Sequence, residues 1–485
     1  MTSLLIPRII FLSLVLLFLQ ILKGEAQTLL IDWQRTFGGT GNDILQDIYP
    51  TADSNYILIG LTDSNNLDVS CELKGKHDIW VIKMDPLGNI IWQKCLGGTV
   101  EEGNPYTKII QTSDGGYLFI TESWSSDVDV VGHHLLSDAW TVKLDAFGNI
   151  MWAKSFGGSA WDVPRNLLEL PGKRYLVMSR STSSDGDVPV NIDTDPESFD
   201  AWVFIVDSAG EFLMNKVYGG TGDDDLYKPI LMSDGNIALF GLTNSTDGDL
   251  TDQPVDTTDG WLLKIDTNGM ILSSQVYGNI NYESFLDAFA TDDGGFIAFG
   301  ETGDPVAPID QGSYHANADW WAVKLDVAGN MEWQGVYGGS EDENFRRAAP
   351  VSDNSGYYMS GSSTSTDGDV NCPPSAGTNY YIVRLALDGA LLSAIAPGGT
   401  KSDFCYAITP SGIAVGGTYS SNYDVLDFKG QADGWLIHLD FSTSILPEEK
   451  VDVISAYPNP ANEFFVVKGI KSGYNLRLNN IMGKT

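Results

Sequence analysis

The fold is decided by a stretch that begins at Asp78 and reads DIWVIKMDPLGNIIWQKCLGG (residues 78–98). It holds two apolar runs, 78–84 and 90–96, which are separated by a turn that contains Gly88 and Asn89. Short apolar runs bounded by turn residues of this kind are typical of β-strands. The stretch therefore predicts a β-hairpin, and the Gly97-Gly98 pair marks its end.

The pattern recurs along the chain with a period close to 60 residues. A Gly-Gly pair, or a variant of it, begins at Gly38, Gly97, Gly157, Gly219, Gly278, Gly338 and Gly398. An Asp-x-Trp motif repeats with the same period at Trp80, Trp140, Trp202, Trp261, Trp321 and Trp435, and Asn379-Tyr-Tyr381 stands in register with it. Two independent markers that share one period indicate seven copies of a single structural unit.

Each unit has room for four short strands. In the first unit we expect them at 45–52, 55–61, 78–84 and 90–96. We name them A to D in chain order. Tight A–B turns such as Asp114-Gly-Gly and Asp293-Gly-Gly supply the positive φ that such hairpins need. Four strands per unit, repeated radially, predict an all-β protein with the architecture of a seven-bladed β-propeller.

The two ends of the repeat region predict that the ring is closed. Residues 33–37 match strand D of the other units, but no strands A, B or C precede them. The unit that starts at Gly398 has strands A, B and C and lacks strand D. The N-terminal strand therefore fits the vacancy in the last blade, where it removes two exposed sheet edges. We expect the propeller to span residues 27–441.

The C–D stretch Lys143-Leu-Asp-Ala-Phe-Gly-Asn-Ile-Met-Trp152 resembles the tryptophan-docking repeat of quinoprotein propellers. It also resembles the repeats of about sixty residues found in secreted bacterial propellers, and this second resemblance covers all seven units. A quinoprotein site requires adjacent cysteines and a set of acids that hold the cofactor, and the chain has no adjacent cysteine pair. The resemblance is therefore taken to imply the fold alone.

Residues 1–26 have the composition of a secretory signal peptide. Arg8 is followed by an apolar run at 9–22, and Gly24-Glu-Ala26 fits a small-x-small cleavage site. The alternative is a membrane anchor, although the run is shorter than the ~20 residues that a span needs. No cysteine follows the run as a lipoprotein anchor would require, and no later segment is apolar enough to cross a membrane.

The other end changes character at residues 442–452, which we interpret as a linker. Tyr457-Pro-Asn-Pro460 and the apolar run after it resemble the start of the C-terminal sorting domain of the type IX secretion pathway. The resemblance covers 453–485, and because the family's domain continues through further strands, this copy is expected to be partial. It implies the type IX secretion machinery as a partner and the outer surface of a Gram-negative bacterium, or its medium, as the destination. The alternative is an ordinary proline turn between two strands.

The charge of the chain excludes some classes of partner. Acidic residues outnumber basic ones 64 to 28, which gives a net charge of −36. Binding to nucleic acid, or to an anionic membrane surface, requires clustered lysine and arginine. The acidic excess instead favours solubility and association with cations.

A candidate calcium motif recurs in the B–C loops of six units. It has the form Asp/Asn-x-Asp, and paired carboxylates are ligands that Ca²⁺ prefers. The alternative is an Asx-type turn that satisfies backbone N–H groups of the loop, and recurrence in six units favours architecture over a single site. The acidic members are Asp127, Asp129, Asp185, Asp187, Asp247, Asp249, Asp367 and Asp369, and Asn66-Leu-Asp68 and Asn422-Tyr-Asp424 complete the set.

Features that break the sevenfold symmetry are the candidate ligand site. Trp124 and Trp161 have no counterparts in other units, and exposed tryptophan stacks on sugars or anchors a partner protein. The alternative is local packing in the loops. His133 and His134 share a loop with Trp124, and adjacent side chains of an extended chain point apart, which argues against a zinc site.

The inner strands carry a second set of candidates near the central channel: Asp47, Lys108, Lys228, Asp287, Arg346 and Arg347. They either bind a small polar ligand or pair with one another. The cysteines Cys71, Cys95, Cys372 and Cys405 allow three disulfide pairings, and the sequence does not choose among them.

The sequence contains no Gly-x-Ser-x-Gly elbow, phosphate-binding loop or His-Glu-x-x-His motif. The leading hypothesis is therefore a secreted or surface-exposed binding or adhesion propeller, with a glycan or protein ligand on its B–C and D–A loop face. A polysaccharide hydrolase that uses carboxylates at the channel mouth is the alternative. A structural module for display, without a ligand of its own, is the third.

Overall fold

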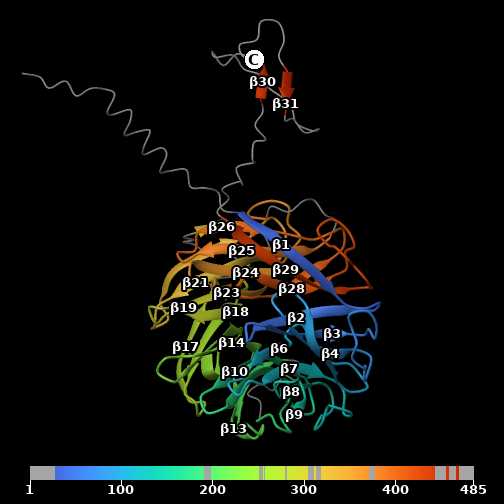
Figure 1. Ribbon diagram of the computed structural model, residues 1–485. Helices are drawn as coiled ribbons and strands as arrows, with labels where there is room; N and C mark the ends of the chain where they lie inside the picture. Colours follow the sequence, from blue (N-terminus) through green and yellow to red (C-terminus); the bar gives the residue numbers. More distant parts are fainter. Residues whose placement is uncertain are drawn as a thin grey trace, which may run out of the picture. The chain divides into compact units, whose positions relative to one another are not determined.

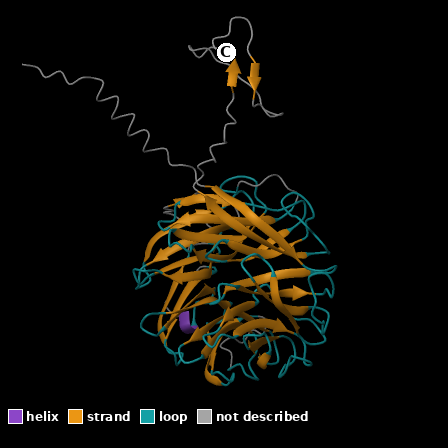
Figure 2. Ribbon diagram, in the orientation of Figure 1, coloured by secondary structure: helices purple, strands orange, loops and turns teal. Residues whose placement is uncertain are grey.

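Each sixty-residue unit folds into one antiparallel sheet, and seven such sheets form a ring (Figures 1 and 2). The computed structural model describes residues 28–189, 198–250, 255, 257–278, 281–303, 311–312, 318–370, 377–442, 455–457 and 466–468. Residues Leu29–Asp440 belong to one unit, which is the propeller. Among the described residues the only helical element is a single 3₁₀ turn, η1 (Gly248–Leu250).

The first four blades follow the chain in strict order. Blade 1 contains β2 (Asp43–Pro50), β3 (Tyr56–Thr62), β4 (Asp78–Met84) and β5 (Ile90–Leu96). Blade 2 contains β6 (Lys108–Gln111), β7 (Tyr117–Ser123), β8 (Asp138–Leu144) and β9 (Ile150–Phe156). Blade 3 contains β10 (Asp162–Leu170), β11 (Arg174–Ser181), β12 (Asp200–Val206) and β13 (Phe212–Tyr218). Blade 4 contains β14 (Asp224–Leu231), β15 (Ile237–Thr243), β16 (Asp259–Ile265) and β17 (Ile271–Tyr277).

The remaining blades depart from this order in two places. Blade 5 contains β18 (Glu283–Ala290), β19 (Phe296–Thr302), β21 (Asp319–Leu325) and β22 (Met331–Tyr337), and β20 (Gln311–Gly312) pairs in parallel with β22. Blade 6 contains β23 (Glu343–Pro350), β24 (Gly356–Ser363), β25 (Asn379–Ala386) and β26 (Leu391–Ile395). Blade 7 contains β27 (Asp403–Ile408), β28 (Ile413–Thr418), β29 (Asp433–Ser442) and, from the other end of the chain, β1 (Thr28–Phe37).

The sheet order β1-β29-β28-β27 confirms that the N-terminal strand closes the last blade. Side chains reinforce this pairing. The indole N–H of Trp435 donates to Oε1 of Gln34 at 3.0 Å, and the ammonium of Lys429 donates to the carbonyl of Thr36 at 2.7 Å. Because β1 covers the edge of β29, blade 7 has four strands like the other blades, and the two ends of the repeat region are joined in one sheet.

The hydrophobic core lies between neighbouring blades. The six Asp-x-Trp tryptophans are almost fully buried there. Five of them donate their indole N–H to a polar side chain on strand D: Trp80 to Gln93, Trp202 to Asn215, Trp261 to Ser274, Trp321 to Gln334, and Trp435 to Gln34. A buried indole N–H needs such an acceptor, so the repeat encodes both partners.

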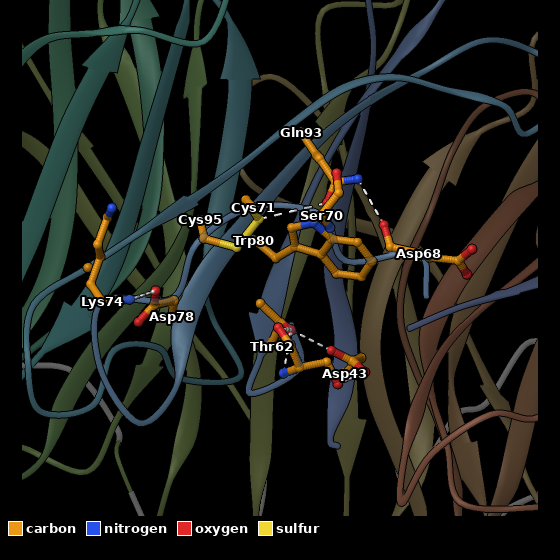
Figure 3. Close-up of a disulfide and its surroundings, with 12 residues drawn as sticks. Asp43, Thr62, Asp68, Ser70, Cys71, Lys74, Asp78, Trp80, Gln93 and Cys95 are labelled. Atoms are coloured by element: carbon orange, nitrogen blue, oxygen red, sulfur yellow. Dashed lines mark hydrogen bonds between the residues drawn. A yellow bond between two sulfur atoms is a disulfide. The ribbon is translucent and has the colours of Figure 1, made fainter. Parts of the chain in front are cut away.

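One disulfide joins Cys71, in the B–C loop of blade 1, to Cys95 on β5 (Figure 3). Beside it, the Gln93 side chain accepts from Trp80 and donates to the carbonyl of Asp68, which holds the loop against strand D. Cys405 is a free, buried thiol. Cys372 lies outside the described residues.

The C-terminal tail belongs to a second unit, described by itself. In it β30 (Ser455–Tyr457) pairs antiparallel with β31 (Val466–Lys468). The predicted signal peptide (1–26), nearly all of the predicted linker (442–452) and the rest of the predicted sorting domain (453–485) lie outside the described residues. Within the described part of the chain, no helix is long and apolar enough to cross a membrane.

Candidate functional site: the central channel

A β-bulge in the innermost strand of six blades shapes the central channel. The register of strand A shifts by one residue against strand B, and the extra residue is left unpaired. Blade 2 shows no such shift, because its β6 begins only at Lys108, after Tyr106. The inserted residues are Gln46, Arg165, Tyr227, Leu286, Arg346 and Tyr406.

The residues that follow the bulges line a cavity of about 580 Å³. Its wall also includes the ends of the strands A and the prolines that lead into the A–B turns, among them Pro50, Pro350 and Pro410. The cavity therefore lies toward the A–B turn end of the channel. The equivalent positions around its wall are Asp47, Lys108, Asn166, Lys228, Asp287, Arg347 and Ala407.

The charged groups of this wall pair with one another across blades. The carboxylate of Asp287 lies 2.7 Å from the ammonium of Lys228 and 3.7 Å from the guanidinium of Arg347. Asp47 lies 3.6 Å from the ammonium of Lys108, and burial raises the pKa of Asp47 to about 6 even though Arg347 opposes the shift. At this level three cations face two carboxylates. A third carboxylate, Glu169, also lines the cavity, where it accepts from the N–H and the hydroxyl of Ser113, so the cavity as a whole has no cationic excess.

A stack of arginine and tyrosine side chains fills the next level of the channel. The guanidinium carbon of Arg165 lies 4.2 Å from the ring centre of Tyr106 and 5.2 Å from that of Tyr227. Arg346 lies 5.9 Å from Tyr106 and 5.8 Å from Tyr406. About 20 Å³ of free space remains at this level, so the stack forms a floor beneath the larger cavity.

Asp225 anchors this stack. Its carboxylate accepts from Nε of Arg165 at 2.8 and 3.1 Å, and its Oδ2 lies 2.8 Å from Nη2. Both side chains are almost fully buried, and a buried bidentate pair of this kind fixes the plane of the guanidinium. The floor of the cavity is therefore held in one orientation, while the charged wall above it faces the open space.

A second repeated feature lies between blades, at the start of strand A in six blades and, in blade 2, at Glu102 ahead of β6. An acid occupies this position in each blade and accepts from a hydroxyl at the end of strand B, as Asp162 does from Ser181. It also faces the acid that begins strand C of the preceding blade. A Cβ on Gly157 would lie 2.4 Å from Oδ1 of Asp138 and 2.7 Å from Oδ2 of Asp162, so only glycine fits between the two. The seven acids are Asp43, Glu102, Asp162, Asp224, Glu283, Glu343 and Asp403.

Burial raises the pKa of five of these inter-blade acids: Asp43, Glu102, Asp162, Asp224 and Asp403. For Glu102 and Asp162 the strand C acid of the preceding blade adds to the effect. The pKa of Glu102 rises to about 7, and those of Asp162 and Asp224 rise to about 6. Asp433, which begins strand C of blade 7, reaches about 6 beside Asp43. Blade 6 has the neutral Asn379 in place of this strand C acid.

The loop residues predicted as a ligand site lie apart from the channel. Trp124 is half-buried directly after β7, where its backbone N–H donates to the carbonyl of Glu101 at 3.2 Å. Trp161 is 42% exposed directly before β10 and forms an isolated bridge with Ser137. Arg346 and Arg347, in contrast, belong to the channel, so the structure does not bring all the predicted ligand residues into one site.

The expectation that His133 and His134 point apart is wrong. Nδ1 of His133 lies 3.3 Å, and Nδ1 of His134 3.1 Å, from the same oxygen of Asp138. The chain is not extended here, because Gly132 has a φ of +87° and turns the loop. Within the described residues, however, no three His, Cys, Asp or Glu side chains converge as a metal site.

The predicted calcium motif acts on the backbone of the Gly-Gly connections. In blade 2, Asp127 Oδ1 accepts from the N–H of Thr99 at 2.8 Å and Asp129 Oδ2 from that of Gly97 at 3.3 Å. Asp185 and Asp187, Asp247 and Asp249, and Asn422 and Asp424 repeat the arrangement. Asp367 accepts from the N–H of Ser340, and the N–H of Asp369 donates to the carbonyl of Gly338. These contacts are those of a loop-capping motif.

Sequence reasoning placed Arg346 near the channel and missed the rest of the arginine–tyrosine floor. Arg165, Tyr227, Arg346 and Tyr406 stand three residues after the acid that begins strand A, and Tyr106 stands four residues after Glu102. The signal was present as one repeat position that holds a large side chain in six blades. It becomes visible only when the units are aligned on that acid.

Comparison with known proteins adds no function. No family model matches the chain, and no curated protein matches it. A Dyadobacter fermentans protein of unknown function is similar in structure, with a TM-score of 0.44, 9% identity, and coverage of 85% of this chain and 99% of that one. A mutant puromycin hydrolase has a TM-score of 0.42 and 13% identity, and the match covers 77% of this chain and 50% of that one. A glucose dehydrogenase has a TM-score of 0.35 and 9% identity, and the match covers 70% of this chain and 97% of that one. The assignment to the seven-bladed propellers rests on the sheets of this chain, and likenesses this weak carry no argument about activity.

Proposed function

We propose that the protein is a secreted binding propeller that takes a small anionic ligand into its central cavity. The observation that carries this proposal is the group of three cations, Lys108, Lys228 and Arg347, at one level of the cavity wall. Asp47 and Asp287 lie at the same level, and Glu169 lines the cavity nearer the A–B turns. The cations are largely buried, with side-chain exposures of 7%, 20% and 12%. Partly desolvated cations of this kind bind carboxylate or phosphate oxygens far more strongly than surface lysines do.

The test is calorimetric titration with inorganic phosphate, citrate and glucuronate. Lys228→Gln should weaken a bound anion by about tenfold or more, because it removes a charge-assisted hydrogen bond, while Arg347 still neutralises Asp287. Lys94→Gln on the outer strand β5 is the matched control. Affinity should also rise as the pH falls below about 6, because protonation of Asp47 leaves the cavity more positive. Absence of heat with all three anions, or equal affinity in both variants, contradicts the proposal.

A second candidate is a polysaccharide hydrolase, and one observation favours it. The same cavity holds Asp47, whose pKa is raised to about 6 by burial, and Asp287, which is ion-paired. Two carboxyl groups in different environments are the components of general acid–base catalysis. Release of reducing sugar from a polymer panel, abolished by Asp47→Asn, would establish this activity.

Export through the type IX pathway is part of the proposal. The signal-like segment at 1–26 supports it, as do the Tyr-Pro-Asn-Pro motif and the pairing of β30 with β31 around it. The experiment is to fuse residues 453–485 to a reporter in a bacterium that has this pathway. Export of the fusion should depend on the pathway and should fail when 453–460 are deleted. Retention of the intact fusion in the periplasm would refute this part.

A further inference from the structure

The middle residue of the B–C loop motif adopts left-handed backbone in all six loops that carry it. The φ values are +63° at Gly186, +61° at Gly248 and +65° at Gly368. The other three loops hold large residues in the same conformation: Leu67 (+56°), Val128 (+56°) and Tyr423 (+55°). The position therefore suits glycine, and half of the loops do not use it.

These three large residues adopt a backbone conformation that is unfavourable for them. A Cβ is unfavourable in the left-handed region, and a β-branched residue such as Val128 is an outlier there. Packing does not explain them, because the residues are 64%, 56% and 72% exposed at Leu67, Val128 and Tyr423. Strained residues that contribute little to the core point to a function outside the fold.

The three residues lie on consecutive blades. Tyr423 belongs to blade 7, Leu67 to blade 1 and Val128 to blade 2, whose sheets are neighbours in the ring (Figure 1). The glycine versions belong to blades 3, 4 and 6. Further exposed apolar side chains lie in the same loops or in the connection before blade 2. We call the whole set the loop patch: Leu67, Val100, Val128, Val131, Leu135, Leu136, Tyr423 and Leu426.

The surroundings of the loop patch are acidic. The segments 63–77, 99–102, 124–137 and 419–432, which carry it, contain eight acidic residues besides the buried Glu102, and three lysines. Apolar patches with a charged rim are typical of protein interfaces, and complementary charge steers the partner and fixes its orientation. A second copy of this acidic chain would be repelled, because like charges would meet across the interface.

We propose that the loop patch docks a polypeptide partner whose contact surface carries aromatic or aliphatic side chains flanked by lysine or arginine. Leu67, Val128 and Tyr423 provide apolar contacts, and the acidic loops provide the complementary charge. The site lies on the loop face and is independent of the cavity, so Lys228→Gln leaves it intact.

The decisive variant is the triple change Leu67→Gly, Val128→Gly and Tyr423→Gly, which copies the residue found in the other three loops. Peptides selected from a random phage library on the wild-type protein should combine apolar and basic residues and bind less tightly as salt is raised. They should lose about tenfold or more in affinity for the triple variant. Because glycine suits the backbone, the melting temperature of that variant should be unchanged or higher.

The matched control is Leu87→Ala, Phe147→Ala and Leu387→Ala, which removes exposed apolar groups from C–D turns on the opposite face. It should retain full peptide affinity. Several results would overturn the proposal: no enriched peptide, acidic enriched peptides, or equal affinity for wild type and triple variant. A clear fall in the melting temperature of the triple variant would also overturn it, because these side chains would then serve the fold. Binding of the loop patch to glycans on an array, without binding to any peptide, would also overturn the proposal.

Discussion

Phe37→Ala should test the closure of the ring. Phe37 is the last residue of β1 and is fully buried. It packs in one cluster with Leu45 and Trp80 of blade 1 and with Leu436 of blade 7, so it lies at the junction between the first and last blades. Truncation of a buried phenylalanine to alanine costs about 3 to 5 kcal/mol, from lost burial and from the cavity left behind. We expect a loss of this size in the free energy of unfolding.

The assay is urea unfolding followed by tryptophan fluorescence, with two matched variants. Leu30→Ala removes a half-exposed side chain from the same strand and should change the free energy by no more than about 0.5 kcal/mol. Phe156→Ala removes the equivalent buried residue at the end of β9, in a blade built from consecutive strands. If closure is as strong as any other blade contact, Phe37→Ala and Phe156→Ala should lose similar amounts. If the urea midpoint of Phe37→Ala equals that of Leu30→Ala, Phe37 does not stabilise the junction between the first and last blades.

Two further predictions concern pH and the disulfide. Stability should fall as the pH is raised from about 4 to about 7. The inter-blade acids Glu102, Asp162, Asp224 and Asp433, with folded pKa values of about 6 to 7, keep protons there that the unfolded chain releases. Melting temperatures across this range check the prediction, and Asp433→Asn, which copies Asn379 of blade 6, should flatten the profile; a steady rise toward pH 7 would contradict it. Replacing Cys71 and Cys95 by serine should cost about 3 kcal/mol, since the bond closes a loop with a sequence separation of 24 residues. A reductant should lower the melting temperature of the wild type only, and an unchanged melting temperature after proven reduction would count against the estimate.

Strands C and D of the first unit were predicted to the residue, at 78–84 and 90–96, because their apolar runs end at glycine turns. Strand A was predicted at 45–52 and is observed at Asp43–Pro50. Its polar first residue gave no strand signal, although Asp43 is fixed there by hydrogen bonds to Thr62 and Gly39. The bulge after Leu45 further disrupts the alternation on which such a prediction depends.

The candidate site was only partly accessible from the sequence. Counting along strand A was sufficient to place Lys108, Lys228 and Arg347 near the channel, because every unit presents its first strand to the axis. The contacts of Arg165 with Tyr106 and Tyr227 could not be predicted in this way, because they join side chains from blades 2, 3 and 4. A repeat pattern predicts which positions face the axis, but not which side chains meet across it.

The pairing of β1 with β29 also determines the order in which the molecule can be completed. The ribosome makes β1 before any other described strand, yet the partner of β1 appears only at Asp433–Ser442. Throughout synthesis the nascent polypeptide therefore carries an unmatched strand at its leading end and a growing stack of sheets behind it. The ring can close only after β29 has been made, and until then β1 is a strand without its partner, the kind of unpaired edge on which partly folded chains misassemble.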